Sequence, residues 1–199
     1  MKRLIAITTP YLFEEETTII NRLFGEGLQT LHLRKPEAEK SQLITLLEQI
    51  EPVYYPRIIL HDHFDLAPVF ALGGVHLNRR NSEVPAGFAG SISRSCHTLE
   101  ELKRYEGLDY LFLSPIFPSI SKEGYGEGFP LEVLKNATEQ GVITQRIIAL
   151  GGMDTHTILR LKGLGFGGVA VLGALWGKNP QPEEVLRRYY PLKQATEQI

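Results

Sequence analysis

The sequence is poor in the features that mark a secreted or membrane-bound protein. Its 199 residues include one cysteine, Cys96, so no disulfide can form within the chain and a reducing compartment is permitted. No apolar run approaches the ~20 residues that cross a bilayer, and the apolar run near the N-terminus is too short for a signal peptide. These absences favour a cytoplasmic protein without a membrane partner.

The sequence also has no large excess of positive or negative charge. Lys and Arg number 21 against 23 Asp and Glu, which gives a net charge of −2. Nucleic-acid-binding proteins concentrate positive charge, so we expect no nucleic-acid partner. The hydrophobic share of 43% is that of a globular chain, and the length fits one domain over residues 1–199.

What the chain does contain is a series of short apolar runs rich in Ile, Val and Leu. We expect strands at 4–7, 31–33, 58–60, 74–77, 91–93, 110–113, 147–150 and 169–172. Runs of this kind are typical of parallel strands covered by helices. Amphipathic spacing predicts the intervening helices at 14–26, 39–50, 98–106, 130–140, 154–164 and 181–190. Pro68 shortens any helix in 63–71, and no regular helix is expected in 78–90.

Strict alternation of strand and helix restricts the topology. Right-handed crossovers build either a closed barrel or an open doubly wound sheet. Eight units favour an α/β fold of the (β/α)8 TIM barrel type, in a single domain. The alternative, a flavodoxin-like open sheet, uses only about five strands and leaves the others unexplained.

Polar residues or glycines follow nearly every predicted strand, at the end where barrels bind ligands. They are Thr8, Arg34, His61, Asp62, His76, Ser95, Cys96, His97, Ser114, Gly151, Gly152 and Gly173. Glycines after the last two strands let backbone N–H groups approach an anion. The sequence therefore predicts a small phosphorylated ligand, held in part by Gly151, Gly152 and Gly173. Other glycines nearby, such as Gly163 and Gly165, are expected only to form turns.

A long segment without secondary-structure signals, residues 115–129, follows the sixth predicted strand. Loops of this length in a compact chain commonly close over a ligand or bind it. Ser119, Ser121 and Lys122 offer hydrogen-bond donors to phosphate oxygens.

The run His61-Asp62-His63 raises the question of a metal. Catalytic zinc needs three protein ligands, and no other cluster in the sequence completes such a set. We therefore favour Asp62 as an oxygen ligand of Mg²⁺ over a histidine zinc site. His32 and His76 are interpreted as polar residues on the inner face. Cys96 and His97 are neighbours on a strand and so face opposite sides, which argues against a Cys–His catalytic pair.

These residues, in this order, resemble the thiamine phosphate synthase/TenI family. The similar segments run from Leu4 to Trp176 and include 31–34, 61–67, 74–77, 93–101, 115–118, 121–122, 149–153 and 168–171. The resemblance implies a (β/α)8 barrel that acts in thiamine biosynthesis. Synthase members join a hydroxymethylpyrimidine diphosphate to a thiazole phosphate and release diphosphate, whereas TenI members aromatise a thiazole phosphate carboxylate tautomer.

The resemblance also implies roles for particular residues. Arg34, Ser95, Ser119, Ser121 and Lys122 match the positions that hold the diphosphate in synthases, and Asp62 matches one of two aspartates that hold Mg²⁺. Gly151, Gly152 and Gly173 match the glycines that hold the thiazole phosphate, and His61 and Leu172 complete the expected substrate-binding set. His97 matches the histidine that transfers the proton in TenI members.

Three departures bear on the choice of reaction. Synthases carry Arg-x-Lys after the second strand, where this chain has Arg34-Lys35-Pro36. They carry Asn-Asp after the third, where it has His61-Asp62, and a second magnesium aspartate where it has Asn81. Losing one anionic ligand weakens a Mg²⁺ site. Arg79 and Arg80 are candidates to replace part of the metal's charge.

A tautomerase needs only a phosphate anchor and a positioned base, so the leading hypothesis is a TenI-type tautomerase with His97 as the proton-transfer group. It would need no cofactor. The alternative is a thiamine phosphate synthase with Mg²⁺ at Asp62, and a third interpretation is a non-catalytic thiazole-phosphate binder. A homodimer is possible, with Tyr54, Tyr55, Tyr189 and Tyr190 as interface candidates or merely as packing residues of the outer helices.

Overall fold

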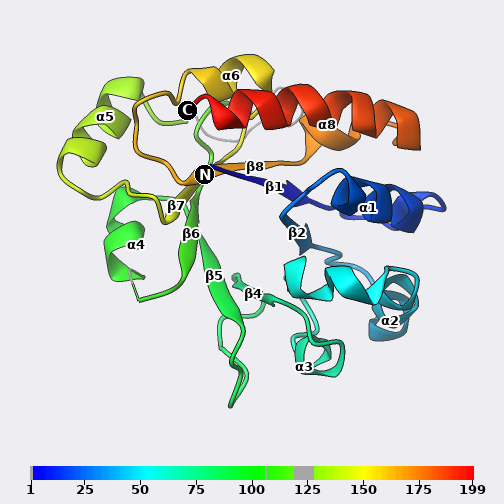
Figure 1. Ribbon diagram of the computed structural model, residues 1–199. Helices are drawn as coiled ribbons and strands as arrows, with labels where there is room; N and C mark the ends of the chain where they lie inside the picture. The colour runs from blue at the N-terminus through cyan, green and yellow to red at the C-terminus, as the bar shows by residue number, and fades with distance from the viewer. Residues whose placement is uncertain (1, 106, 119–127) are drawn as a thin grey trace.

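A closed ring of eight parallel strands forms the centre of the molecule (Figure 1). The computed structural model describes residues 2–105, 107–118 and 128–199. The strands are β1 (Arg3–Ile7), β2 (Thr30–Leu33), β3 (Ile58–Leu60), β4 (Gly74–Leu77), β5 (Ser91–Cys96), β6 (Tyr110–Leu113), β7 (Ile147–Leu150) and β8 (Gly168–Val171). Each strand pairs with the next, and β1 pairs with β8, where Ile5 lies opposite Ala170. The predicted barrel is confirmed, and the open-sheet alternative is wrong because the ring closes.

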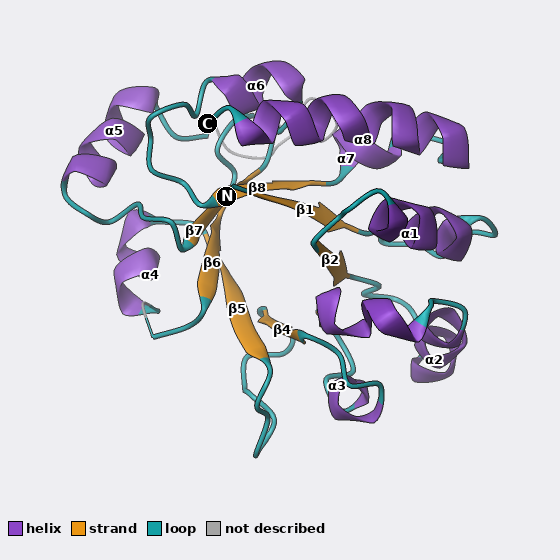
Figure 2. Ribbon diagram, in the orientation of Figure 1, coloured by secondary structure: helices purple, strands orange, loops and turns teal. Residues whose placement is uncertain are grey.

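Helices surround the ring on its outside (Figure 2). They are α1 (Glu16–Gly25), α2 (Lys40–Glu48), α3 (Leu66–Val69), α4 (Leu99–Arg104), α5 (Leu131–Glu139), α6 (Thr155–Leu159), α7 (Gly173–Trp176) and α8 (Pro182–Glu197), with a 3₁₀ turn at Pro52–Arg57. As expected, α3 is short and residues 78–90 form no helix. Among the described residues, no helix is long and apolar enough to cross a membrane.

Most predicted helix bounds are right to within two residues, and the side-chain caps explain where two helices begin. The Thr98 hydroxyl accepts a hydrogen bond from Glu101 N at 3.2 Å, and one Asp154 carboxylate oxygen accepts from His156 N and Thr157 N. Two ends were predicted wrongly: α6 stops at Leu159, short of residue 164, and α8 continues to Glu197. The short α7 was not predicted either.

Side-chain alternation along the strands divides the buried residues into two layers. Leu4 and Ala6 of β1 face the helices, as do Leu111 and Leu113 of β6. Their neighbours point into the barrel, where Ile5, Ile7, Tyr110, Phe112, Ile148 and Ala170 form a separate inner cluster. A parallel strand that is covered on both faces needs apolar or fully bonded residues at every position.

A buried ion pair fixes the segment after β2 against α1. The Lys35 ammonium lies 2.5 Å from a Glu16 carboxylate oxygen and donates to the backbone oxygens of Thr9 and Tyr11. Both side chains are buried, at 0% and 1% exposure, and the second Glu16 oxygen has no hydrogen-bond partner among the described residues. Burial raises the pKa of Glu16 and lowers that of Lys35, while each charge opposes the shift of the other.

We expect Glu16→Gln to destabilise the fold by about 3–5 kcal/mol, because it leaves the buried Lys35 ammonium without its counter-charge. Urea unfolding followed by circular dichroism measures the loss. The double variant Glu16→Leu/Lys35→Met removes both charges and should recover most of the stability. If the wild type and Glu16→Gln had equal free energies of unfolding, the ion pair would not stabilise the fold.

Candidate active site

The interior of the barrel is apolar on one side and polar on the other. Above Arg3, which lies over the Tyr110 ring, the inward residues of β1, β7 and β8 are aliphatic. The inward positions of β2, β4 and β5 and the residue after β3 carry imidazoles and hydroxyls: His32, His61, His76, Ser93 and Ser95. The polar side leads up to the carboxyl ends of the strands, where barrels bind their ligands. One part of the mouth is therefore built for polar groups.

Three buried histidines make hydrogen bonds in two groups on this polar side, and the rings of His61 and His76 stack between the groups. His32 Nδ1 lies 2.9 Å from His61 Nε2, and its Nε2 lies 2.7 Å from the Tyr110 hydroxyl. His76 bonds Ser93 through Nδ1 and Ser95 through Nε2, both at 2.8 Å. Burial lowers the pKa of all three imidazoles, that of His76 to about 3, so they are neutral at pH 7.

The three imidazoles do not fit a zinc ion. The statement that no other cluster completes a histidine set was wrong, since His32 and His76 lie beside His61 and nitrogen atoms of all three come within 4.8 Å of one another. Both nitrogens of His32 and of His76 already have hydrogen-bond partners. The His61 and His76 rings stack at 4.3 Å and 22°, so the lone pairs in their planes do not converge. His63 is turned away and bonds Ala38 O.

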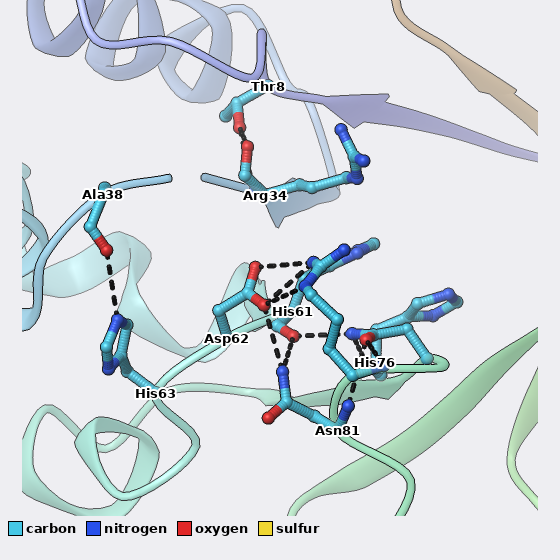
Figure 3. Close-up of polar contacts among 10 residues, drawn as sticks. Thr8, Arg34, Ala38, His61, Asp62, His63, His76 and Asn81 are labelled. Carbon is cyan, nitrogen blue, oxygen red and sulfur yellow. Dashed lines mark hydrogen bonds and ion pairs between the residues drawn. The ribbon is translucent and has the colours of Figure 1, made fainter. Parts of the chain in front are cut away.

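Arg34 follows β2 at the mouth, and β1 fixes its backbone. The Thr8 hydroxyl accepts from Arg34 N at 2.9 Å and donates to Arg34 O at 3.1 Å. Arg34 lies on the polar side of the mouth (Figure 3), and its charge adds to burial in lowering the pKa of both His61 and His76. Lys35 does not join it, because its side chain is buried against α1. The lysine of the synthase pattern is thus absent from the described mouth.

Asp62 is held by two neighbours from the segment after β4 (Figure 3). Its Oδ1 accepts from Arg80 Nη2 at 2.9 Å, from Arg80 Nε at 3.2 Å and from Asn81 Nδ2 at 3.0 Å. Its Oδ2 accepts from Arg80 Nη2 at 3.2 Å. The carboxylate predicted to bind Mg²⁺ is therefore paired with a guanidinium.

His97 lies at the end of β5, on the side opposite to Cys96, as the alternation predicted. Cys96 is buried in the layer between barrel and helices, whereas His97 is exposed. His97 Nδ1 donates to Ser114 O at 2.9 Å, and Nε2 makes no bond to the described residues. The backbone N–H of His97 donates to Glu101. These contacts fix the orientation of the His97 ring and leave one nitrogen open.

Glycines occupy the ends of β7 and β8 as predicted. Gly151 and Gly152 have φ of +97° and +64°, and an added Cβ would come within 2.9 Å of Pro115 or Phe117. Glycine is thus required at both positions by the backbone conformation and by the close neighbours. The same conformation brings the two backbone amides close to the mouth. Leu172 precedes α7, whose first residue is Gly173, and no side chain caps this helix.

Three predicted diphosphate-binding residues, Ser119, Ser121 and Lys122, lie outside the described residues, as does most of the predicted loop 115–129. The tyrosines considered for an interface have packing roles: Tyr54 stacks on Phe24 at 4.9 Å and Tyr189 is buried. Only Tyr190 of the four is substantially exposed.

Sequence reasoning missed the role of Asn78, in the segment after β4. Asn78 Oδ1 accepts from the backbone N–H groups of Arg80 and Asn81, and Asn78 Nδ2 donates to His61 O at 2.7 Å. This turn directs Arg80 to Asp62. An asparagine two residues before an arginine was the available signal, since Asn side chains commonly bond the backbone two residues on.

Fold and site together define a (β/α)8 barrel with a polar, cationic half and a glycine-lined half at its mouth. The family model described as thiamine monophosphate synthase matches residues 4–175. The chain belongs to this thiamine phosphate synthase/TenI family, and it is an enzyme of thiamine biosynthesis. The family resemblance seen in the sequence is confirmed.

Individual relatives agree with this assignment. A crystal structure of thiamine phosphate pyrophosphorylase from Bacteroides thetaiotaomicron is 39% identical, with a TM-score of 0.88 over 98% of both chains. A thiamine-phosphate synthase from Bacteroides fragilis is 27% identical over 81% of this chain and 85% of its own. Thiamine phosphate pyrophosphorylase from Pyrococcus furiosus, at 20% identity and a TM-score of 0.75, supports the fold.

The neutral histidine network predicts acid lability. An unfolded chain binds a proton on each imidazole near pH 6.5, whereas His76 in the fold binds one only near pH 3. Because the unfolded state binds more protons between these values, the free energy of unfolding falls as the pH falls through this window, by at most about 1.4 kcal/mol per pH unit for each histidine.

Urea unfolding at several pH values between 7.5 and 4.5 measures this slope. We expect His76→Gln to have a shallower slope than the wild type, and His156→Gln, which alters an exposed histidine, to keep the wild-type slope. A His76→Gln slope equal to that of the wild type would contradict the account.

Proposed function

We propose that the chain is a thiamine phosphate synthase, a transferase that joins a hydroxymethylpyrimidine diphosphate to a thiazole phosphate. The similarity to synthases and to the Bacteroides thetaiotaomicron pyrophosphorylase supports this reaction better than the tautomerase that the sequence alone favoured. In the transfer, the carbon–oxygen bond to diphosphate breaks and a carbon–nitrogen bond to the thiazole forms, with diphosphate as the leaving group.

One observation carries the proposal: the mouth has a cationic region apart from the glycine-lined ends of β7 and β8. Arg80 bonds Asp62 directly after β3, and Arg34 follows the neighbouring strand β2 and lies close by (Figure 3). A tautomerase acts on one phosphorylated ligand, whereas a synthase must hold two phosphorylated substrates. Two separate regions suited to anions match the second requirement.

Different residues then bind the two substrates. Arg34, Arg80 and Ser95 bind the diphosphate, and His61 borders it. The hydrogen bond between His76 Nε2 and the Ser95 hydroxyl, at 2.8 Å, orients that hydroxyl from inside the barrel. Ser119, Ser121 and Lys122 remain predicted partners of the diphosphate.

The ends of β7 and β8 receive the thiazole phosphate. Backbone N–H groups near Gly151, Gly152, Leu172 and Gly173 suit its phosphate, because glycines allow close approach and the first turn of α7 has no side-chain cap. Positive groups on the opposite side stabilise the charge that develops on the departing diphosphate.

An endpoint assay tests the reaction directly. The purified protein is incubated with hydroxymethylpyrimidine diphosphate and thiazole phosphate, with and without Mg²⁺, and thiamine phosphate and diphosphate are quantified. We expect the two products in equal amounts. Initial rates at several substrate concentrations should show that Arg34→Gln lowers kcat/KM by at least about tenfold, because a charged hydrogen bond is lost. Binding of both substrates with no product would instead favour a non-catalytic binder.

The second candidate function is the thiazole tautomerase, and the geometry of His97 favours it. With Nδ1 donating to Ser114 O, the free Nε2 is placed to take up a proton. Conversion of the thiazole phosphate carboxylate tautomer is followed by ultraviolet absorbance. If this activity is present, His97→Ala should abolish it, and unchanged turnover of the variant would remove His97 from the mechanism.

A further inference from the structure

The family resemblance implies Mg²⁺ between two aspartates, at the positions of Asp62 and Asn81, and the contacts of these residues do not fit a metal. Both Asp62 oxygens accept hydrogen bonds from the Arg80 guanidinium at 2.9–3.2 Å. The Asp62 side chain is only 11% exposed, so little of it remains open to another cation. Hard cations such as Mg²⁺ need several free oxygen ligands.

The Asn81 side chain also presents the wrong group. Its Nδ2 lies 3.0 Å from Asp62 Oδ1 and 3.1 Å from His61 O, and both of these atoms are acceptors. Turning the amide over would place its oxygen against two other oxygens, so the NH₂ orientation is fixed by its surroundings. Asn81 therefore donates at the position where a metal ligand must accept.

The turn that carries Arg80 directs its guanidinium to Asp62 and leaves part of that group open. The backbone N–H of Arg80 bonds Asn78 Oδ1 at 2.9 Å, and Asn78 is itself tied to His61 O. Arg80 bonds Asp62 through Nε and Nη2, and its Nη1 has no partner in the part of the chain that the structure describes. With 47% of the side chain exposed, two N–H donors remain for a ligand.

We propose that the Arg80 guanidinium, oriented by Asp62, replaces the divalent cation and binds the diphosphate directly, so that this chain binds diphosphate without Mg²⁺. The site keeps its overall charge, because one carboxylate with one guanidinium is neutral, as are two carboxylates with one divalent cation. A guanidinium presents paired donors that suit phosphate oxygens. The identity of the ligand rests on the proposed synthase function.

Isothermal titration with inorganic diphosphate tests the proposal without any turnover. In EDTA we expect the wild type to bind diphosphate, and Arg80→Gln to weaken binding by about 10- to 100-fold, which is the usual loss for a hydrogen bond to a charged group. Arg79→Gln is the matched control, since Arg79 is exposed and makes no bond to the described residues. It should bind within about threefold of the wild type.

The double variant Arg80→Gln/Asn81→Asp recreates the two-aspartate arrangement. We expect it to bind diphosphate in the presence of Mg²⁺ and to lose binding in EDTA, whereas the wild type should bind diphosphate in EDTA. Circular dichroism confirms that each variant is folded. Wild-type binding that requires Mg²⁺, or an Arg80→Gln affinity equal to that of Arg79→Gln, would overturn the proposal.

The outcomes also separate this proposal from the proposed function. Diphosphate binding in EDTA without formation of thiamine phosphate would refute the synthase and leave the Arg80 site standing. Formation of thiamine phosphate that stops in EDTA would support the synthase and refute the replacement of the metal by Arg80.

Discussion

Side-chain alternation in a closed parallel barrel is the constraint on which the rest of this structure depends. Closure of β1 on β8 removes both edges of the sheet and forces every second residue of each strand into the interior. Above Arg3, that interior is aliphatic near β1, β7 and β8 and contains bonded imidazoles and hydroxyls between β2 and β5. Polar residues are tolerated there because they bond one another.

This division of the interior continues into the mouth. His76 and His32 form hydrogen bonds with Ser95 and His61, so the two residues that we propose to lie beside the diphosphate are held by buried, neutral imidazoles. Positive charge is supplied above this base by Arg34 and Arg80, which come from different loops. The glycines after β7 serve turn geometry. In the function that we propose, they also let a single phosphate approach the backbone, while the other half of the mouth binds a diphosphate.

Much of the fold followed from the sequence, since apolar runs located all eight strands and alternation placed Cys96 and His97 on opposite faces. The meeting of His32, His61 and His76 did not follow, because it depends on strand register. Lys35 was unpredictable for a related reason: its long side chain can reach either the mouth or α1, and the buried Glu16 decides. The pairing of Arg80 with Asp62 depends on the turn built by Asn78. The spacing of Asn78 and Arg80 indicates this turn, but the sequence does not show which carboxylate Arg80 meets.

The most direct test of the account is a crystal structure of the protein grown with diphosphate and excess Mg²⁺. The account predicts diphosphate oxygens within hydrogen-bond distance of the Arg34 and Arg80 guanidinium groups, with Arg80 still bonded to Asp62. An octahedral Mg²⁺ ligated by Asp62, with Arg80 displaced from the carboxylate, would contradict it.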